Sequence, residues 1–167
     1  MASTYKPVTE IGQPASAVLR QAKLHHIGFA VRSIPKTVEG FAVSIGASWN
    51  GSIIHDPLQQ VRVTFMSRHE PGPLIELIEP ADAKSPISKF VSSGGGLHHF
   101  CYEVKSLDDE LQLARSVGGL IVKRPLPAVA FEGRRIAWVF TRQKLLLEYL
   151  EATPGSIGET EPTGIET

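Results

Sequence analysis

The sequence predicts an α+β fold made of two copies of one βαβββ module, whose mixed sheets enclose a site. The main observation is an internal repeat: LHHIGFAV at 24–31 returns as LHHFCYEV at 97–104, an offset of 73 residues. A second pair follows in the same order, because LIELIE at 74–79 resembles LLEYLE at 146–151. Repeated segments at nearly one offset indicate a duplicated structural unit.

A helix is expected after the first strand of each copy. Ser33 precedes IPKTVEGF, and Ser106 precedes LDDELQLA, again 73 residues apart. Serine is a favourable N-cap because its hydroxyl accepts a hydrogen bond from an unpaired helix N–H. The two helical patterns end near glycine, at Gly46 and at Gly118–Gly119, as helices often do.

Each module has room for two more strands between the helix and the last strand. We place them at 48–55 and 60–67 in the first module and at 120–126 and 134–141 in the second. The segment 60–67 alternates clearly around Val61, Val63 and Phe65. A four-stranded sheet with one helix leaves its other face open, so two such sheets can enclose a site between them.

The predicted organisation is a single domain at 23–152, with modules at about 23–82 and 95–152. A linker helix is expected at 84–94, with Ser85 as its cap and Pro86 in its first turn. Residues 1–22 are interpreted as an N-terminal extension. The segment 153–167 is rich in Gly, Pro, Thr and Glu and is expected to be a flexible tail.

Composition narrows the classes of function. Seventeen basic and seventeen acidic side chains give a formal net charge of zero, so no charge surplus indicates a nucleic-acid or anionic membrane partner. The single cysteine, Cys101, cannot form an intrachain disulfide, which favours a reducing compartment. No apolar run approaches the ~20 residues that span a bilayer. We therefore expect a soluble, cytoplasmic protein.

One histidine of each LHH motif is expected to face a site, because side chains alternate across a strand. His26 shares its face with the small residues Gly28 and Ala30, and His99 lines up with Cys101. Their neighbours His25 and His98 share the other face with apolar residues, which favours core packing. Alternation thus favours His26 and His99 as site residues without deciding between the members of each pair. Cys101 is interpreted as a packing residue.

A glutamate lies at the same place in the last strand of each module. Glu76 and Glu148 both stand between apolar neighbours, and a buried carboxylate is costly unless its charge is compensated. A lone glutamate of this kind often marks an exposed strand face, but here it repeats in register with the histidines. Two imidazoles and two carboxylates, brought together by a pseudo-twofold axis, would bind one divalent ion such as Co, Zn, Ni or Mn.

These segments resemble the vicinal-oxygen-chelate superfamily (glyoxalase, bleomycin-resistance and dioxygenase proteins) and, within it, methylmalonyl-CoA epimerase. The resemblance lies in LHHIGFAV, QQVRVTF, IELIEPADAKSPISKFVSSGGGLHHFCYEV, EGRRIAWVF and LLLEYLE. It implies the paired-module fold with a metal held by the second histidine of each pair, His26 and His99, together with Glu76 and Glu148. It also implies an acyl-CoA thioester as substrate and a homodimer.

The activity that the resemblance implies is proton abstraction next to a thioester carbonyl by a metal-dependent epimerase or isomerase. Glu148 is the first choice for the general base and Glu76 the second. Two departures bear on the substrate: the turn before the last strand is the short TRQK, and Val63 occupies a position where some epimerases carry a second glutamate.

Two alternatives stay open, a glyoxalase I-type lactoylglutathione lyase and a non-catalytic member that binds a small molecule. Basic side chains could contact the phosphates of CoA or simply form a solvated surface: Lys123, Arg124, Arg134 and Arg135.

Overall fold

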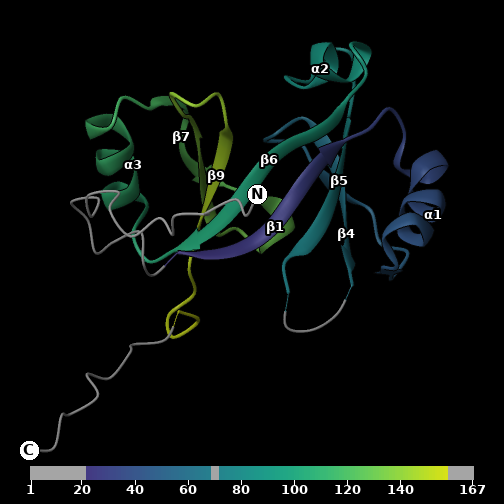
Figure 1. The fold of residues 1–167 in the computed structure, drawn as a ribbon, viewed down its shortest axis with the longest axis horizontal. Helices are drawn as coiled ribbons and strands as arrows, with labels where there is room; N and C mark the ends of the chain where they lie inside the picture. Colours follow the sequence, from purple (N-terminus) through teal and green to yellow (C-terminus); the bar gives the residue numbers. More distant parts are fainter. Residues whose placement is uncertain (1–21, 69–71, 158–167) are drawn as a thin grey trace, which may run out of the picture.

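The chain folds into two βαβββ modules that join through their first strands (Figure 1). The computed structural model describes residues 22–68 and 72–157. The first module contains β1 (Lys23–Ala30), α1 (Ile34–Ile45), β2 (Ser48–Trp49), β3 (Ile54–Asp56), β4 (Val61–Ser67) and β5 (Leu74–Pro80). The second contains β6 (Gly96–Val104), α3 (Leu107–Ser116), β7 (Leu120–Pro127), β8 (Arg135–Phe140) and β9 (Leu146–Glu151), and α2 (Ser88–Ser92) connects the two.

One mixed sheet runs through both modules in the order β2-β4-β5-β1-β6-β9-β8-β7, and β3 pairs with β4. Within the modules β1 is parallel to β5 and β6 is parallel to β9, whereas β1 and β6 pair in antiparallel fashion. Ile27 lies opposite Phe100, its equivalent in the repeat. A pseudo-twofold axis therefore passes between β1 and β6.

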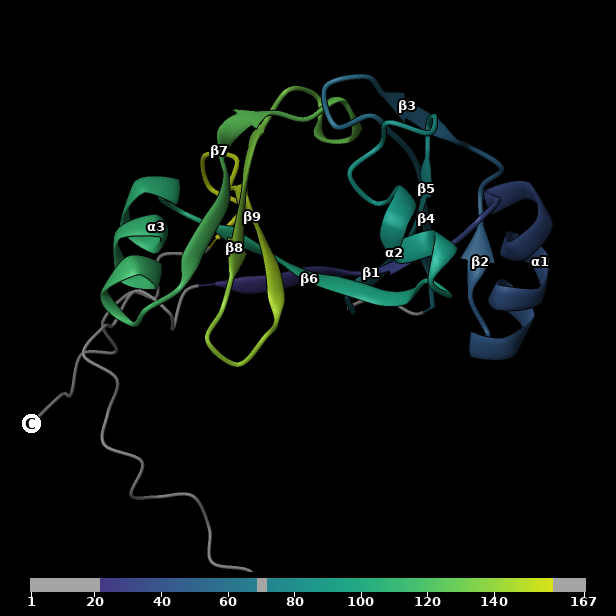
Figure 2. The same ribbon diagram turned by 90° about the horizontal axis from the view of Figure 1, so that it is seen from above.

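Each module buries its helix against the outer face of its own strands. Ile34 and Val38 of α1 pack with Leu77 of β5, and Leu111 of α3 packs with Val139 of β8. Figure 2 shows the sheet curved like a trough, with α1 and α3 on its outer flanks. The inner faces of the two modules consequently look toward each other, and this is where the predicted site should lie.

Two predicted elements differ from the structure. The strand expected at 48–55 is broken into β2 and β3, because Asn50 accepts a hydrogen bond from the amide of Ser52 and Gly51 adopts a positive φ of 81°. The linker helix is shorter than 84–94: it begins at Ser88 with Ile87, not Ser85, in the N-cap position. The residues just before this helix form a turn, in which the Ser88 amide donates a hydrogen bond to the Ser85 carbonyl.

The caps of the two main helices also differ from each other. The Ser106 hydroxyl accepts a hydrogen bond from the Asp109 amide, as predicted. Ser33 occupies the N-cap position of α1 but makes no side-chain cap bond, so its predicted role is wrong. The buried carboxylate of Glu79 on β5 accepts from the Ile34 amide at 2.6 Å instead. The Glu79 carboxylate of β5 thus caps α1 in place of the Ser33 hydroxyl.

None of the helices in the described ranges is long and apolar enough to cross a membrane. The predicted N-terminal extension and most of the predicted tail lie outside the described residues, so both stay predictions.

Candidate metal centre

The structure brings His26, Glu76, His99 and Glu148 together at the seam between the modules. The Nε2 atoms of the two histidines lie 3.0 Å apart. Oε2 of Glu148 is 3.1 Å from Nε2 of His26 and 3.5 Å from Nε2 of His99. The corresponding distances from Oε2 of Glu76 are 3.6 and 3.3 Å. All four residues are at most 4% exposed, so the cluster is shielded from solvent.

This arrangement fits a single divalent ion. Nitrogen and oxygen ligands at bond lengths of about 2.1 Å stand roughly 3 to 3.5 Å from one another around a metal, which is close to the spacing among His26, Glu76 and His99. Within the described part of the chain, Oε2 of Glu76 is buried without a hydrogen-bond partner. Such an atom is costly unless something compensates it. His26, Glu76 and His99 satisfy the distance requirement for a shared metal, and Glu148 reaches the same imidazole nitrogens.

A β-bulge occurs at each LHH motif. In the β1–β6 ladder Leu24 pairs with Tyr102 and His26 with Cys101, so His25 is an extra residue on its strand. Gly28 pairs with His99 and Phe29 with Leu97, which makes His98 the extra residue on the other strand. An extra residue interrupts the alternation of side chains. The prediction that His25 and His98 pack in the core against the helices is therefore wrong.

Both bulged histidines instead contact the candidate ligands. Nδ1 of His25 lies 2.9 Å from Nδ1 of His26, and Nδ1 of His98 lies 3.0 Å from Nδ1 of His99. Burial, followed by the neighbouring imidazole, lowers the pKa of His25 and of His98 to about 4. Both rings are then neutral, so each can accept a hydrogen bond from an Nδ1–H of its neighbour. Such partners orient metal-binding histidines.

Gly28 makes room for one of these rings. A Cβ atom at this position would lie 2.1 Å from Cε1 of His99, closer than real Cβ atoms approach. The small residues on this face of β1 favour His26 as a site residue in the sequence. In the structure the absence of a side chain at Gly28 also leaves space for the imidazole of the opposite module. The equivalent residue Cys101 is fully buried in the core, consistent with its predicted packing role, and burial raises the pKa of its thiol.

The two carboxylates differ in their electrostatics. Burial raises the pKa of Glu76 to about 8, and the nearby charge of Glu148 adds to this effect, although His99 opposes it. Burial would also raise the pKa of Glu148, but hydrogen bonds from His26 and His99 hold it well below its usual range. Glu148 thus carries the negative charge that faces both histidines. Oε2 of Glu76 has no hydrogen-bond donor among the described residues.

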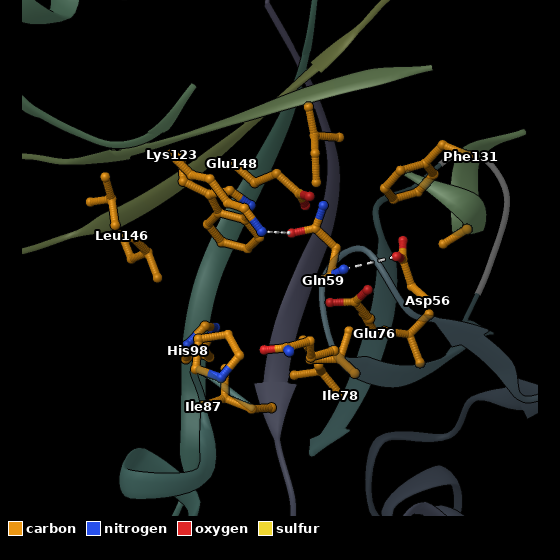
Figure 3. Close-up of a pocket in the computed structure, with 18 of the residues that line it drawn as sticks. Asp56, Gln59, Glu76, Ile78, Ile87, His98, Lys123, Phe131, Leu146 and Glu148 are labelled. Atoms are coloured by element: carbon orange, nitrogen blue, oxygen red, sulfur yellow. Dashed lines mark hydrogen bonds between the residues drawn. The ribbon is translucent and has the colours of Figure 1, made fainter. Parts of the chain in front are cut away.

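The cluster borders a cavity of about 520 Å³ that lies between the modules (Figure 3). Its walls are mainly apolar and include Val63, Ile78 and Trp138, while Glu76 and Glu148 supply carboxylates. An apolar cleft with a few converging polar groups is the usual form of a small-molecule site.

The basic residues considered as CoA contacts have varied surroundings. Arg134 pairs with Glu103 at 2.8 Å, and Arg135 pairs with Glu151. Lys123 lines the cavity and donates to the side chain of Gln59. Arg124 is exposed on β7.

Comparison with known proteins defines the family. The family model described as the Glyoxalase/Bleomycin resistance protein/Dioxygenase superfamily matches residues 25–138. The chain belongs to this superfamily.

Among curated proteins, the chain is 26% identical over 119 residues to an ethylmalonyl-CoA/methylmalonyl-CoA epimerase of Cereibacter sphaeroides, which covers 70% of this chain and 87% of that protein. A crystal structure of a hypothetical protein from Bacillus halodurans superposes with a TM-score of 0.69 at 30% identity and covers 84% of this chain and 99% of that one. A Streptomyces coelicolor methylmalonyl-CoA epimerase variant in complex with 2-nitronate-propionyl-CoA gives a TM-score of 0.68 at 21% identity, over 80% and 99% of the two chains.

Proposed function

We propose that the protein is a metal-dependent epimerase that removes and returns a proton at the carbon next to the carbonyl of an acyl-CoA thioester. The observation that carries this proposal is the cluster of His26, Glu76, His99 and Glu148 beside an apolar cavity. The similarity to the Cereibacter ethylmalonyl-CoA/methylmalonyl-CoA epimerase supports the substrate class.

The residues of the site have different roles in the proposed reaction. A bound divalent ion, such as Co, Zn, Ni or Mn, would supply Lewis-acid stabilisation of the negative charge that develops on the substrate's carbonyl oxygen. His26 and His99 would hold the ion through Nε2, while His25 and His98 would keep the rings in the required orientation. Glu148 acts as general base and accepts the α-proton, because its carboxylate lines the cavity beside the two histidines.

Epimerisation also needs a proton donor on the opposite face of the substrate carbon. Among the described residues, the carboxylates that line the cavity are Asp56, Glu76 and Glu148. Asp56 is engaged by the amides of Leu58, Gln59 and Val129, and Val63 offers no proton. Glu76, which comes from the module opposite Glu148, is therefore the second acid–base group in this proposal.

Solvent-deuterium exchange tests the division of roles. Protein loaded with Co²⁺ is mixed in D₂O with one epimer of methylmalonyl-CoA, and both deuterium uptake and inversion are followed by NMR. The wild type is expected to exchange and invert. Glu148→Gln keeps an oxygen ligand but loses the base, so exchange should fall by about 10² to 10⁴-fold. Glu76→Gln should exchange the proton of one epimer without inverting it.

The control is Glu39→Gln, which makes the same chemical change on the exposed face of α1 and should leave both rates unaltered. Turnover of the methylglyoxal–glutathione hemithioacetal, without exchange of the thioester α-proton, would replace the proposal with the glyoxalase I alternative. Purified protein that contains no stoichiometric metal and is unaffected by His99→Ala would support the non-catalytic alternative.

A further inference from the structure

The loop between β3 and β4 presents a side-chain amide to the cavity. Gln59 lies on this loop and comes from the first module, while Lys123, on β7, comes from the second. Nζ of Lys123 donates to Oε1 of Gln59 at 2.9 Å. Figure 3 shows this bond among the lining residues, with the amide of Gln59 between Lys123 on one side and Asp56 on the other.

The partner of Oε1 determines how the amide is oriented. Oxygen and nitrogen of a glutamine amide are interchangeable in shape, and their assignment depends on the hydrogen bonds they make. The ammonium of Lys123 has only donors, so it must face the oxygen of Gln59. Nε2 of Gln59 then points away from Lys123. It is buried and makes no hydrogen bond to any group in residues 22–68 and 72–157.

The loop holds this orientation firmly. Oδ1 of Asp56 accepts hydrogen bonds from the amides of Leu58 and Gln59, and Oδ2 accepts from the amide of Val129 in the opposite module. Gln60 has a positive φ of 58°, a conformation that a residue other than glycine adopts only when its surroundings impose it. Its carbonyl accepts a bond from the Ala81 amide. The Gln59 side chain is thus presented on a fixed frame.

A buried donor without an acceptor lowers stability, and a ligand oxygen in the cavity would supply the missing hydrogen bond. We infer that Gln59 is a specificity-determining residue, whose Nε2 donates to a second acceptor oxygen on the acyl group, and that Lys123 is its positioning residue. The inference rests on the proposed function and narrows it. The preferred substrates are acyl thioesters that carry a carboxylate or a second carbonyl, and simple alkanoyl thioesters are poor ligands.

The ligands that test this are methylmalonyl-CoA and propionyl-CoA, which differ by the carboxylate and share the whole CoA moiety. Their dissociation constants are measured by calorimetry on the Co²⁺-loaded protein. Gln59→Leu should weaken methylmalonyl-CoA about tenfold, the size of one lost net hydrogen bond. Propionyl-CoA should change by less than about twofold, since it offers no second oxygen. Gln143→Leu, in the exposed turn between β8 and β9, is the control.

Two further variants separate a binding role from a structural one. Gln59→Glu keeps the size and the contact with Lys123 but replaces the donor with an acceptor, so it should weaken methylmalonyl-CoA more than Gln59→Leu does. Lys123→Met releases the amide and should reproduce part of the loss for methylmalonyl-CoA only. Lys123→Arg restores a donor and should restore affinity, while Lys105→Met, at an exposed position, should have no effect.

The inference would be overturned if Gln59→Leu weakened the binding of both thioesters equally, or of neither. Exchange of the α-proton, which tests the proposed function, does not depend on that outcome. Equal weakening of both by Lys123→Met would assign Lys123 to the CoA moiety and overturn its positioning role. Failure of the wild type to bind either thioester would overturn the proposed function itself, which distinguishes the two failures.

Discussion

The two modules carry equivalent residues in unequal surroundings. His26 and His99 occupy matching places, each with an adjacent histidine bonded to its Nδ1. The carboxylates differ, because Glu148 accepts from both histidines and Glu76 has a buried oxygen without a partner. The duplication thus supplies a symmetric pair of imidazoles, and the neighbourhood of each carboxylate makes the two glutamates electrostatically different.

The modules also differ in how their helices are attached. Glu79 of the first module is buried and bridges the Ile34 amide and Arg62. Its equivalent in the second module, Glu151, pairs with Arg135 near the surface. The same sequence position is a structural support in one copy and a surface ion pair in the other. Substitutions at equivalent positions test how far the two copies have diverged.

The largest effect is expected at Gly28. Gly28→Ala places a Cβ against the His99 ring, so it should lower the affinity for Co²⁺ by more than about a hundredfold, which exceeds the usual effect of losing an orienting partner. The equivalent change, Cys101→Ala, removes a buried thiol beside Glu148 but introduces no clash with either histidine, so it should leave affinity within about threefold. Titration with Co²⁺, followed by its visible absorption, measures both. Equal affinities for the two variants would contradict the described placement of His99.

The bulged histidines should behave alike. His25→Ala and His98→Ala each remove one Nδ1 partner, and each should weaken Co²⁺ binding about 10 to 100-fold. His55→Ala, at an exposed position on β3, serves as the control and should bind normally. If only one of the two variants loses affinity, the symmetric description of the LHH motifs is wrong.

The carboxylates at the C-terminal ends of β5 and β9 should differ in their effect on stability. Glu79→Ala leaves the Ile34 amide and Arg62 without their acceptor and should cost about 2 kcal/mol of unfolding free energy. Glu151→Ala, in a largely exposed pair, should cost less than about 1 kcal/mol. Urea denaturation of both variants gives the comparison, and a larger loss for Glu151→Ala would reverse the assignment.

A pH effect distinguishes Glu76 in the metal-free protein. Its pKa is raised to about 8, so the folded state binds the proton more tightly than the unfolded state does. The stabilisation is therefore present below pH 4.5 and is lost as the pH rises toward 8. Glutamine does not ionise, so Glu76→Gln should not lose stability over this pH range. The Tm of the variant should therefore exceed that of the wild type by an amount that grows from pH 5 to pH 8.

The lowered pKa of His25 and His98 acts in the opposite direction, because their stabilisation is lost as the pH falls through 6.5 toward 4. The interval from pH 6.5 to 8 therefore reports on Glu76 without them. A constant difference in Tm across that interval would contradict the raised pKa.

The smallest effect concerns the helix caps. Ser106→Ala removes the bond to the Asp109 amide and should destabilise the protein by about 0.5 to 1 kcal/mol. Ser33→Ala removes no cap bond, because Glu79 serves the same helix end, and should change stability by less than about 0.3 kcal/mol. Equal losses in urea denaturation would show that Ser33 contributes after all.

Sequence periodicity predicts the paired modules and most strand positions, because these follow from local patterns repeated at one offset. It favours His26 and His99 without deciding within each pair, and the family resemblance supplies that choice. Asn50-Gly51 is a turn signal in the sequence, and it accounts for the break after Trp49 within the predicted strand at 48–55. The bulges at His25 and His98 were not predictable from alternation, because an extra residue is defined by the partner strand. The Glu79 cap depends in the same way on a contact between residues 34 and 79.

The central claim is that ligands from both modules hold one metal ion. Metal analysis and Co²⁺ titration of the wild type, His26→Ala, His99→Ala and the control His55→Ala test it most directly. We predict one ion per chain in the wild type and the control, and loss of at least about a hundredfold in affinity for each of the other two variants. Stoichiometric metal that persists at unchanged affinity in either His26→Ala or His99→Ala would contradict the shared site.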